Sequence, residues 1–281
     1  MRGKANTGLE MFSSNILNRG LVLLGCGKMG SALLSGWLEQ GIDPKSVWIL
    51  DPKPSEWLLS IGVRVNEMLP DDPAVVLVAV KPQMMGEALP RLQRFGSATT
   101  LFISVAAGTP IAAFEDVLGK STPIVRAMPN TPAAIGQGIT ALIGNGRATE
   151  KDVAEAQSLM AAVGQTLVLQ NEQQMDAVTG VSGSGPAYVF LMIEALAAAG
   201  VNQGLPEDMA MQLAQATVAG AGALAVQSGE SAEQLRINVT SPNGTTQAAL
   251  EILMRSEAGL PQLLDQAVAA ASRRSQELSN G

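Results

Sequence analysis

Three glycines at a characteristic spacing are the first residues in this sequence that could do chemistry. Gly25, Gly27 and Gly30 follow the apolar run Leu21–Leu24 and fit the pattern G-x-G-x-x-G. At a turn from a strand into a helix, the first glycine permits the tight bend and the second lets the backbone approach a pyrophosphate. The third lets helix and strand pack closely, and the helix N-terminus faces the phosphate charge. The spacing therefore predicts a dinucleotide site rather than a structural glycine turn.

A charged pair follows the second expected strand, Val47–Leu50. Asp51 lies near the position expected for the residue that contacts the adenosine ribose. Its carboxylate would accept a hydrogen bond from a 2′-hydroxyl and repel a 2′-phosphate, which favours NAD. Lys53, two residues on, could pair with that phosphate or could be an ordinary solvated loop lysine. The residues alone leave the choice between NADH and NADPH open.

The sequence contains no histidine and only one cysteine, Cys26. The absence of histidine excludes the usual serine and cysteine hydrolase arrangements and removes the commonest zinc ligand. A single cysteine excludes an intrachain disulfide and a cysteine-cluster metal site. We therefore expect no metal, and chemistry that uses hydroxyls, carboxylates, lysines, backbone groups or a cofactor.

Strand-like and helix-like segments alternate through the first half of the chain, which predicts parallel βαβ units in a doubly wound α/β sheet. Thr149 and Asp152 predict the N-cap of a helix that runs to Val163. The expected strands are Leu21–Leu24, Val47–Leu50, Val75–Val80, Thr100–Val105, Ile124–Ala127, Thr140–Ile143 and Thr166–Leu169, with helices between most of them.

After about Asn171 the strand signals end and the chain becomes Ala-rich and helical. We therefore expect a polar N-terminal extension at 1–18 that need not be ordered, a dinucleotide-binding domain at 19–171 and an all-α domain at 172–281. The small-residue faces of the second domain allow close helix contact, either within one chain or in a dimer. The expected helices are Glu172–Val181, Pro186–Ala199, Pro206–Val226, Ala232–Asn238, Thr245–Ser256 and Pro261–Leu278.

The composition limits the possible partners and location. The 281 residues are 47% hydrophobic and 15% charged, with a net charge of −7, so neither nucleic acid nor an anionic membrane surface is an expected partner. Apolar runs such as Val75–Val80 and Tyr188–Ile193 are far shorter than the ~20 residues that span a bilayer. Met1–Arg19 lacks the features of a signal peptide. With the single cysteine, this favours a reducing, cytoplasmic location.

Several longer motifs occur in an order that resembles the pyrroline-5-carboxylate reductases, from about Arg19 to Leu278. The glycine motif alone is also similar to that of 3-hydroxyisobutyrate dehydrogenases, so the last motif does most to indicate the substrate. The motifs are Gly25-Cys-Gly-Lys-Met-Gly30, Val78-Ala-Val-Lys-Pro82, Ser104-Val-Ala-Ala-Gly108, Arg126-Ala-Met-Pro-Asn-Thr-Pro132, Gly180-Val-Ser-Gly-Ser-Gly-Pro-Ala-Tyr188 and Val239-Thr-Ser-Pro-Asn-Gly-Thr-Thr246.

This resemblance implies a Rossmann domain that binds NADPH or NADH, followed by a helical domain that forms a homodimer or a higher ring such as a decamer. It also implies that an asparagine lies by the adenosine ribose and that three loops line the cofactor. The residues expected at the cofactor are Gly25, Gly27, Lys28, Met29, Gly30, Asp51, Lys53, Asn66, Val80, Lys81, Pro82, Ala106, Ala107, Gly108 and Asn130.

The resemblance places the substrate at the loop that opens the helix Thr245–Ser256. The amides of Gly244 and Thr245 would hold the substrate carboxylate at a helix N-terminus. Thr246 matches the family's threonine whose hydroxyl meets the ring nitrogen, and Ser241 matches a serine in the same pocket. From the residues alone, simple N-capping of the helix is the favoured role for both hydroxyls.

The chain departs from the family at a few positions in this region. Asn243 stands where the usual loop has glycine, and asparagine tolerates the left-handed conformation better than most residues. Its side chain could narrow the pocket or bond the substrate. Ser231-Ala232 and Arg236-Ile237 replace the His-Pro and Lys-Asp of many relatives, which leaves the proposed hydroxyls unchanged.

The resemblance implies hydride transfer from NAD(P)H to the cyclic imine 1-pyrroline-5-carboxylate, giving L-proline in the last step of its biosynthesis. A cyclic imine is partly protonated near neutral pH, so the absence of histidine fits. Orientation of the iminium carbon would then supply much of the catalysis. Two alternatives stay open: a reductase of another cyclic imine, and a non-catalytic dinucleotide sensor.

Overall fold

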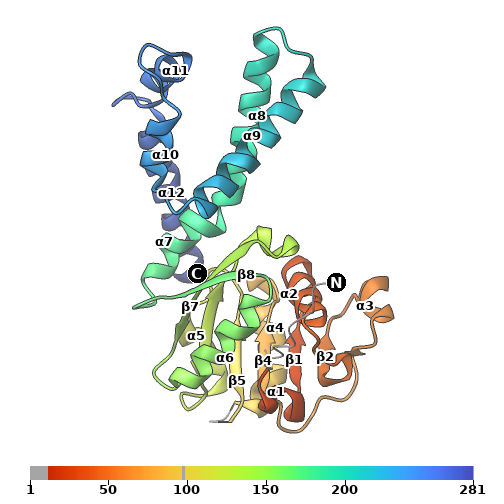
Figure 1. Ribbon diagram of the computed structural model, residues 1–281. Helices are drawn as coiled ribbons and strands as arrows, with labels where there is room; N and C mark the ends of the chain where they lie inside the picture. Colours follow the sequence, from red (N-terminus) through yellow and green to blue (C-terminus); the bar gives the residue numbers. More distant parts are fainter. Residues whose placement is uncertain (1–11, 97–98, 281) are drawn as a thin grey trace. The chain divides into compact units, whose positions relative to one another are not determined.

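The computed structural model describes residues 12–96 and 99–280 of the chain. These residues divide into two compact units (Figure 1). The first runs to Gly183 and takes in the end of the chain from Ser272, and the second is Ser184–Ala271. The first unit is an α/β domain and the second is all-helical, as the sequence predicts.

The first unit is built on one sheet of eight strands in the order β3-β2-β1-β4-β5-β6-β7-β8. The order reverses beside β1, where β2 lies on one side and β4 on the other, which is the place where ligands bind in doubly wound folds. The strands are β1 Leu21–Leu24, β2 Val47–Leu50, β3 Arg64–Val65, β4 Val75–Val78, β5 Leu101–Ser104, β6 Ile124–Met128, β7 Gly138–Gly144 and β8 Gly164–Val168.

The pair β6 and β7 is antiparallel, whereas the sequence predicts a wholly parallel sheet. The connection between the two strands covers only residues 129–137 and contains the 3-10 helix η4, Thr131–Ile135. A parallel crossover needs about a dozen or more residues, so this shorter connection returns the chain antiparallel. Strand β8 then pairs parallel to β7 after the crossover through α6, Glu150–Ala161.

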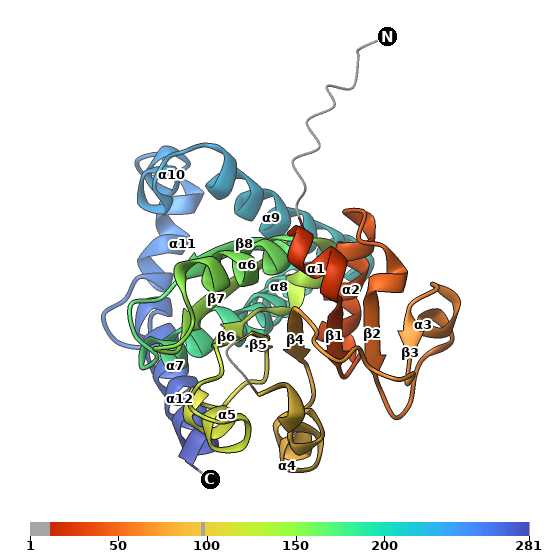
Figure 2. The ribbon, with the colours of Figure 1, turned by 90° about the horizontal axis from the view of Figure 1, so that it is seen from below.

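Helices cover both faces of the sheet (Figure 2). Helices α1, Ser14–Arg19, and α2, Lys28–Glu39, pack with α6 on one face, around the fully buried Trp37. The other face is covered by α4, η3 and α5, which bury a second apolar cluster; these elements are Met85–Ala88, Leu89–Phe95 and Ile111–Leu118. The central strands β1, β4 and β5 are buried on both sides, which explains their continuous apolar sequences.

Part of the expected N-terminal extension is folded. Ser13 caps α1, and Phe12 and Ile16 are buried in the core beside α2. The prediction of a polar extension at 1–18 is therefore wrong for residues 12–18, because two apolar side chains are enough to anchor a short helix. Residues 1–11 lie outside the described residues.

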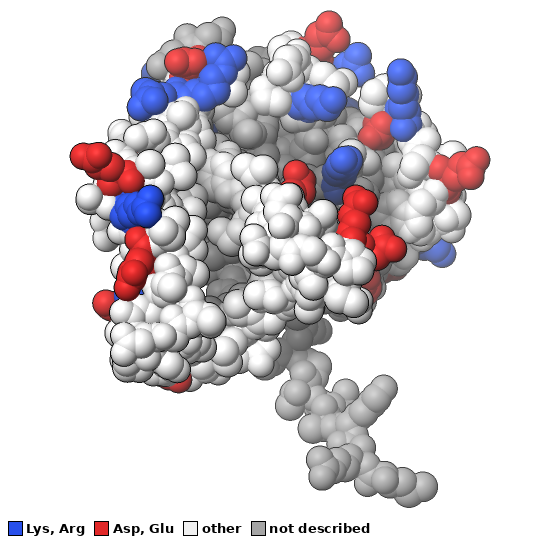
Figure 3. Space-filling view, turned by 90° about the horizontal axis from the view of Figure 1, so that it is seen from above, with Lys and Arg blue, Asp and Glu red and all other residues white. Residues whose placement is uncertain are grey.

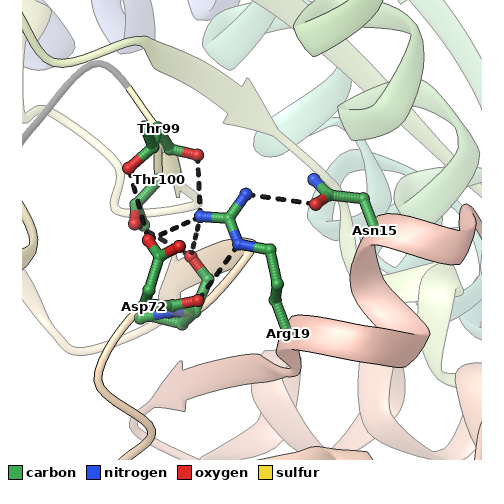
Figure 4. A network of polar contacts seen from close by, with 6 residues as sticks. Asn15, Arg19, Asp72, Thr99 and Thr100 are labelled. Carbon is green, nitrogen blue, oxygen red and sulfur yellow. Dashed lines mark hydrogen bonds and ion pairs between the residues drawn. The ribbon is translucent and has the colours of Figure 1, made fainter.

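Arg19 ties α1 to the amino ends of β4 and β5 (Figure 4). Its guanidinium donates to the Asp72 carboxylate at 2.7 Å and to the Thr99 carbonyl at 3.0 Å. It also donates to the carbonyls of Asp72 and Pro73 and to the Asn15 side chain. The network lies at the end of the strands opposite to their carboxyl ends, so it stabilises the fold rather than the site.

The predicted cap of α6 is present as a reciprocal capping box. The Thr149 hydroxyl accepts from the Asp152 N–H at 3.2 Å, and the Asp152 carboxylate accepts from the Thr149 N–H at 2.8 Å.

The second unit consists mainly of a helical hairpin, α8, Gly185–Asn202, and α9, Glu207–Gln227. Small side chains let the two helices approach, because Ala197, Ala210 and Ala214 are buried between them. The sequence-predicted close contact through small residues is thus present within one chain. The helices α10, Ala232–Asn238, α11, Thr245–Leu253, and the first part of α12, Leu260–Asn280, complete the unit.

Most large apolar side chains of this hairpin are exposed, including Phe190 at 57% and Leu191 at 64%. Uncharged residues cover most of the face shown in Figure 3. Two helical segments, Gln174–Asn202 and Glu207–Gln227, are long and apolar enough to cross a membrane by length and composition, which is weak evidence on its own. The short uninterrupted apolar runs, taken alone, predict no such segments. The alanines and glycines beside these runs extend them.

Candidate active site

The glycine loop has the geometry that its spacing predicts. Gly25 has φ +87°, and a Cβ at this position would lie 2.9 Å from Val80 Cγ1. A Cβ at Gly30 would lie 2.5 Å from the Gly25 carbonyl oxygen. A Cβ at Gly27 would meet no other atom within 4 Å, so of the three loop glycines this one faces open space. Gly27 is also the N-cap of α2, and a pyrophosphate can approach its backbone there.

The end of β2 is joined to this loop through Asp51. One carboxylate oxygen of Asp51 accepts from the Cys26 N–H at 2.7 Å, and the other accepts from the Lys53 N–H at 2.8 Å. Asn66 bonds the Asp51 backbone in both directions, since its Oδ1 accepts from the Asp51 N–H at 3.0 Å and its Nδ2 donates to the Asp51 carbonyl at 2.7 Å. Asn66 has φ +54°, a left-handed conformation that asparagine adopts more readily than most residues.

A cavity of about 370 Å³ opens beside Asp51 and Asn66. Part of its wall comes from Met84, Glu87 and Arg91, which follow one another at helical spacing through three successive short helices: the 3-10 helix η2, Pro82–Met84, then α4 and η3. The predicted site did not include these three residues. The only sequence signal for them is this spacing after Lys81-Pro82, which is shared by any helix that follows a strand. An open glycine cradle with an adjoining cavity fits a dinucleotide.

The predicted cofactor loops lie at the carboxyl ends of the strands. Val80 lines the cavity, whereas Lys81 and Pro82 are exposed. The Ala106 N–H donates to the Ser104 hydroxyl at 3.2 Å. Gly108 has φ +70°, and a Cβ there would lie 3.1 Å from Leu278 Cβ, so the end of α12 lies against this loop.

Two family motifs meet at the end of β6. The Asn130 side chain accepts from the Ile139 N–H at 3.0 Å, and its amide donates to the Ser182 hydroxyl at 3.4 Å. Ser182 belongs to a π-helical turn, Thr179–Gly183, that follows α7, Gln174–Val178. A Cβ at Gly183 would lie 2.5 Å from Met128 Cε, so the end of the Met128 side chain packs against this turn.

Cys26 lies in the glycine loop but has the properties of an inert thiol. Burial, and to a lesser extent the negative charge of Asp51, raise the pKa of Cys26 to about 11. The thiol is therefore protonated near neutral pH and is a poor nucleophile.

The predicted substrate loop lies in the second unit and is ordered by its own hydrogen bonds. Asn243 has φ +57°, so the expected left-handed conformation of the asparagine is confirmed. Its N–H donates to the Gln247 side chain at 2.7 Å. The Gly244 N–H donates to the Ser241 carbonyl at 3.0 Å and is therefore not available to a substrate carboxylate. The amides of Thr245 and Thr246, at the first turn of α11, have no intrahelical partner.

The hydroxyls of this loop are not used for helix capping. Gly244 is the N-cap of α11, and no side chain caps the helix. Among the described residues, the hydroxyls of Ser241 and Thr246 form no hydrogen bond, whereas that of Thr240 donates to the Arg236 carbonyl at 2.6 Å. The capping role favoured by the residues alone is therefore wrong, and two hydroxyls and two amides are available at one loop. The described residues contain no group of three or more His, Cys, Asp or Glu side chains that could hold a metal.

Comparison with known proteins gives one consistent result. Residues 172–278 match the family described as pyrroline-5-carboxylate reductase dimerisation, and residues 20–108 match the family described as NADP oxidoreductase, coenzyme F420-dependent. The chain is 38% identical to a pyrroline-5-carboxylate reductase of Pseudomonas aeruginosa over 92% of this chain and 96% of that protein.

Solved structures agree with this result. A pyrroline-5-carboxylate reductase from Coxiella burnetii is 33% identical with a TM-score of 0.87, covering 93% of this chain and 98% of that one. A pyrroline carboxylate reductase from Plasmodium falciparum with NADP bound is 28% identical with a TM-score of 0.80, over 93% of this chain and 98% of that one. With this identity over nearly its whole length, the chain belongs to the pyrroline-5-carboxylate reductase family.

Proposed function

We propose that the chain reduces 1-pyrroline-5-carboxylate to L-proline with NADH or NADPH. The observation that carries the proposal is that one chain has both an open glycine cradle and the substrate loop. In this loop the hydroxyls of Ser241 and Thr246 form no hydrogen bond among the described residues. A dinucleotide sensor would need only the cradle. We therefore assign the first unit to the cofactor and the loop before α11 to the substrate.

When bound, the reduced nicotinamide supplies the hydride that the imine carbon accepts. The residues of the chain bind and orient the substrate, and they exclude water from it. The amides of Thr245 and Thr246 hold the substrate carboxylate at the start of α11, where the helix dipole favours an anion. The Thr246 hydroxyl forms a hydrogen bond with the ring nitrogen and relays to that nitrogen the proton that it takes up. The Ser241 hydroxyl lies in the same loop and supports this role of Thr246. The Asn243 side chain borders this pocket.

No residue need act as a strong acid, since the imine is basic enough to bind a proton near neutral pH. Most of the rate enhancement then comes from placing the imine carbon against the nicotinamide. This proposal explains why a chain without histidine suits the reaction.

The first experiment is the loss of reduced-nicotinamide absorbance with pyrroline-5-carboxylate, followed by product analysis. Proline formation supports the proposal. The main alternative is a reductase of another cyclic imine. A substrate panel that includes six-membered cyclic imines tests it, because this alternative predicts faster turnover on the larger ring. Binding of the dinucleotide without turnover on any imine would support a sensor instead.

The role of Thr246 is tested by Thr246→Val, which keeps the size of the side chain and removes the hydroxyl. We expect kcat/KM to fall by about 100-fold, within the range for a positioned proton-transfer group. Thr245→Val is the matched control, because its proposed contact is a backbone amide that valine retains. Equal activity of the two variants would contradict the role of the Thr246 hydroxyl.

We also propose that two copies associate through the helical unit, either as a dimer or within a ring such as a decamer. The support is the exposed apolar surface of α8 and α9, together with the match to a dimerisation family. The same surface makes a second copy, rather than a membrane, the proposed partner, and we place the protein in the cytoplasm. Sedimentation velocity without detergent tests this, because a membrane protein would aggregate.

A further inference from the structure

The acidic residue at the end of β2 bears on which reduced cofactor the chain takes. The Asp51 carboxylate is held in place by two backbone donors, at 2.7 Å from the Cys26 N–H and 2.8 Å from the Lys53 N–H. The backbone of Asp51 is held by Asn66 through two further hydrogen bonds. A carboxylate restrained in this way cannot turn aside easily to make room for an approaching anion.

The same carboxylate retains unused acceptor capacity. Two carboxylate oxygens offer about four lone-pair sites, and the two backbone donors occupy one on each oxygen. Asp51 lines the cavity beside the glycine loop, where the adenosine ribose of a dinucleotide binds in this fold. A ribose with both hydroxyls offers two donors, which matches these acceptors. A 2′-phosphate offers only acceptors and carries about −1.5 to −2 charges.

Among the described residues, no Lys or Arg forms an ion pair with Asp51, and the hydrogen bond of Lys53 to Asp51 comes from its backbone. The other charged residues of the cavity wall are Glu87 and Arg91, one of each sign.

We propose that Asp51 makes this chain select NADH over NADPH, through acceptance from the 2′-hydroxyl and repulsion of the 2′-phosphate. This inference rests on the proposed function and adds a cofactor preference to it. It distinguishes the chain from the Plasmodium falciparum relative, whose structure holds NADP.

The test measures binding of the full-length protein without substrate, by calorimetry with NADH, NADPH and the nicotinamide-free pair ADP-ribose and 2′-phospho-ADP-ribose. We expect NADH and ADP-ribose to bind about 100-fold more tightly than their 2′-phosphorylated counterparts. The reason is that the negative charges of Asp51 and a 2′-phosphate repel each other, which lowers the affinity. Asp51→Asn should reduce that ratio by at least about tenfold. Glu150→Gln, which removes an exposed carboxylate of the first unit that does not line this cavity, should leave the ratio within about threefold.

Lys53→Ala tests the opposite assignment, in which Lys53 binds a 2′-phosphate. In that case the variant would weaken the binding of NADPH but not that of NADH, and this result would overturn the proposal. So would wild-type protein that binds NADPH as tightly as NADH, an Asp51→Asn ratio equal to that of the wild type, or binding of neither cofactor. Because no imine is present, a failure of the reductase activity would leave the binding ratio unaffected, so the two failures are distinguishable.

Discussion

The two units of this chain differ in how much of their apolar surface they bury by themselves. In the first unit, side chains such as Trp37, Leu77 and Phe102 are fully buried between the sheet and its helices. In the second unit, the buried apolar side chains are three alanines between α8 and α9. Larger side chains on the same helices, such as Phe190 and Leu191, are more than half exposed.

The polar groups follow the same contrast. The first unit pairs Arg126, which is 6% exposed, with Glu172 at 2.8 Å. The second unit has the ion pair of Arg236 and Glu233, which is exposed and 3.8 Å long. A core of three alanines cannot offset the conformational entropy of ordering a domain of this length. The difference indicates that the first unit is stable within one chain, whereas the second depends on a partner.

The largest expected effect comes from placing a charge on the exposed apolar surface of the second unit. Phe190→Glu should weaken self-association by at least about 100-fold, because the new carboxylate would be buried without a partner in the interface. Sedimentation velocity over a concentration series measures this. The control is Met68→Glu, at an apolar residue of the first unit that is 90% exposed and should tolerate charge. If both variants assemble like the wild type, the second unit does not bury Phe190 against a partner.

The second effect concerns the buried ion pair of the first unit. Arg126→Gln removes a donor from Glu172, which also accepts from the Ile111 N–H at 2.9 Å and is itself 30% exposed. We expect a loss of about 1.5–3 kcal/mol in the free energy of unfolding, the range for hydrogen bonds to charged groups. Arg236→Gln in the second unit should cost about 0–0.5 kcal/mol, because its ion pair is exposed. Urea denaturation compares them, and equal losses would remove the contrast between the units.

The sequence predicted the parts of this contrast that local rules determine. Glycine spacing gave the loop at Gly25–Gly30, the hydroxyl and carboxylate of Thr149 and Asp152 gave a capping box, and Asn243 gave a left-handed turn. Each of these features depends on a few neighbouring residues, so the local sequence is enough to predict it.

The features that were missed depend on distant contacts. Strand β3 has two residues and exists through its pairing with Trp48 and Ile49, and α1 is anchored by a core that other segments build. The commitment of the Gly244 N–H to the Ser241 carbonyl is a detail of loop geometry that residue types do not determine. Glu87 and Arg91 line the cavity because of how α4 and η3 pack against the sheet.

A smaller effect is expected at the helix cap of the first unit. Thr149→Ala removes the hydroxyl that accepts from the Asp152 N–H, and should lower the free energy of unfolding by about 1 kcal/mol. Ser231→Ala removes the corresponding bond to the Gln234 N–H in α10 of the second unit. If that unit gains most of its stability from association, Ser231→Ala should affect unfolding less than Thr149→Ala at a concentration where dimers persist. Thermal unfolding at two protein concentrations measures both, and a larger effect of Ser231→Ala would reverse the comparison.

Cys26 is a chemical reporter of the first unit alone. Its pKa is raised to about 11 against about 9 for a free thiol, so the folded state favours the protonated form. The resulting stability is fully present below about pH 9 and is lost as the pH rises toward 11. At pH 8 we expect alkylation by iodoacetamide to be about 100-fold slower in the native protein than in urea, in proportion to the thiolate fraction.

The same reporter distinguishes the two units when association is broken. If the first unit is stable within one chain, Cys26 of the Phe190→Glu variant should remain as slow to alkylate as in the wild type, although the protein no longer associates. Asp51→Asn should speed alkylation only modestly, because burial is the larger cause of the raised pKa and the charge of Asp51 the smaller. Fast alkylation in Phe190→Glu would mean that the glycine loop loses its structure with the interface, and that the stability of the first unit also depends on the second copy.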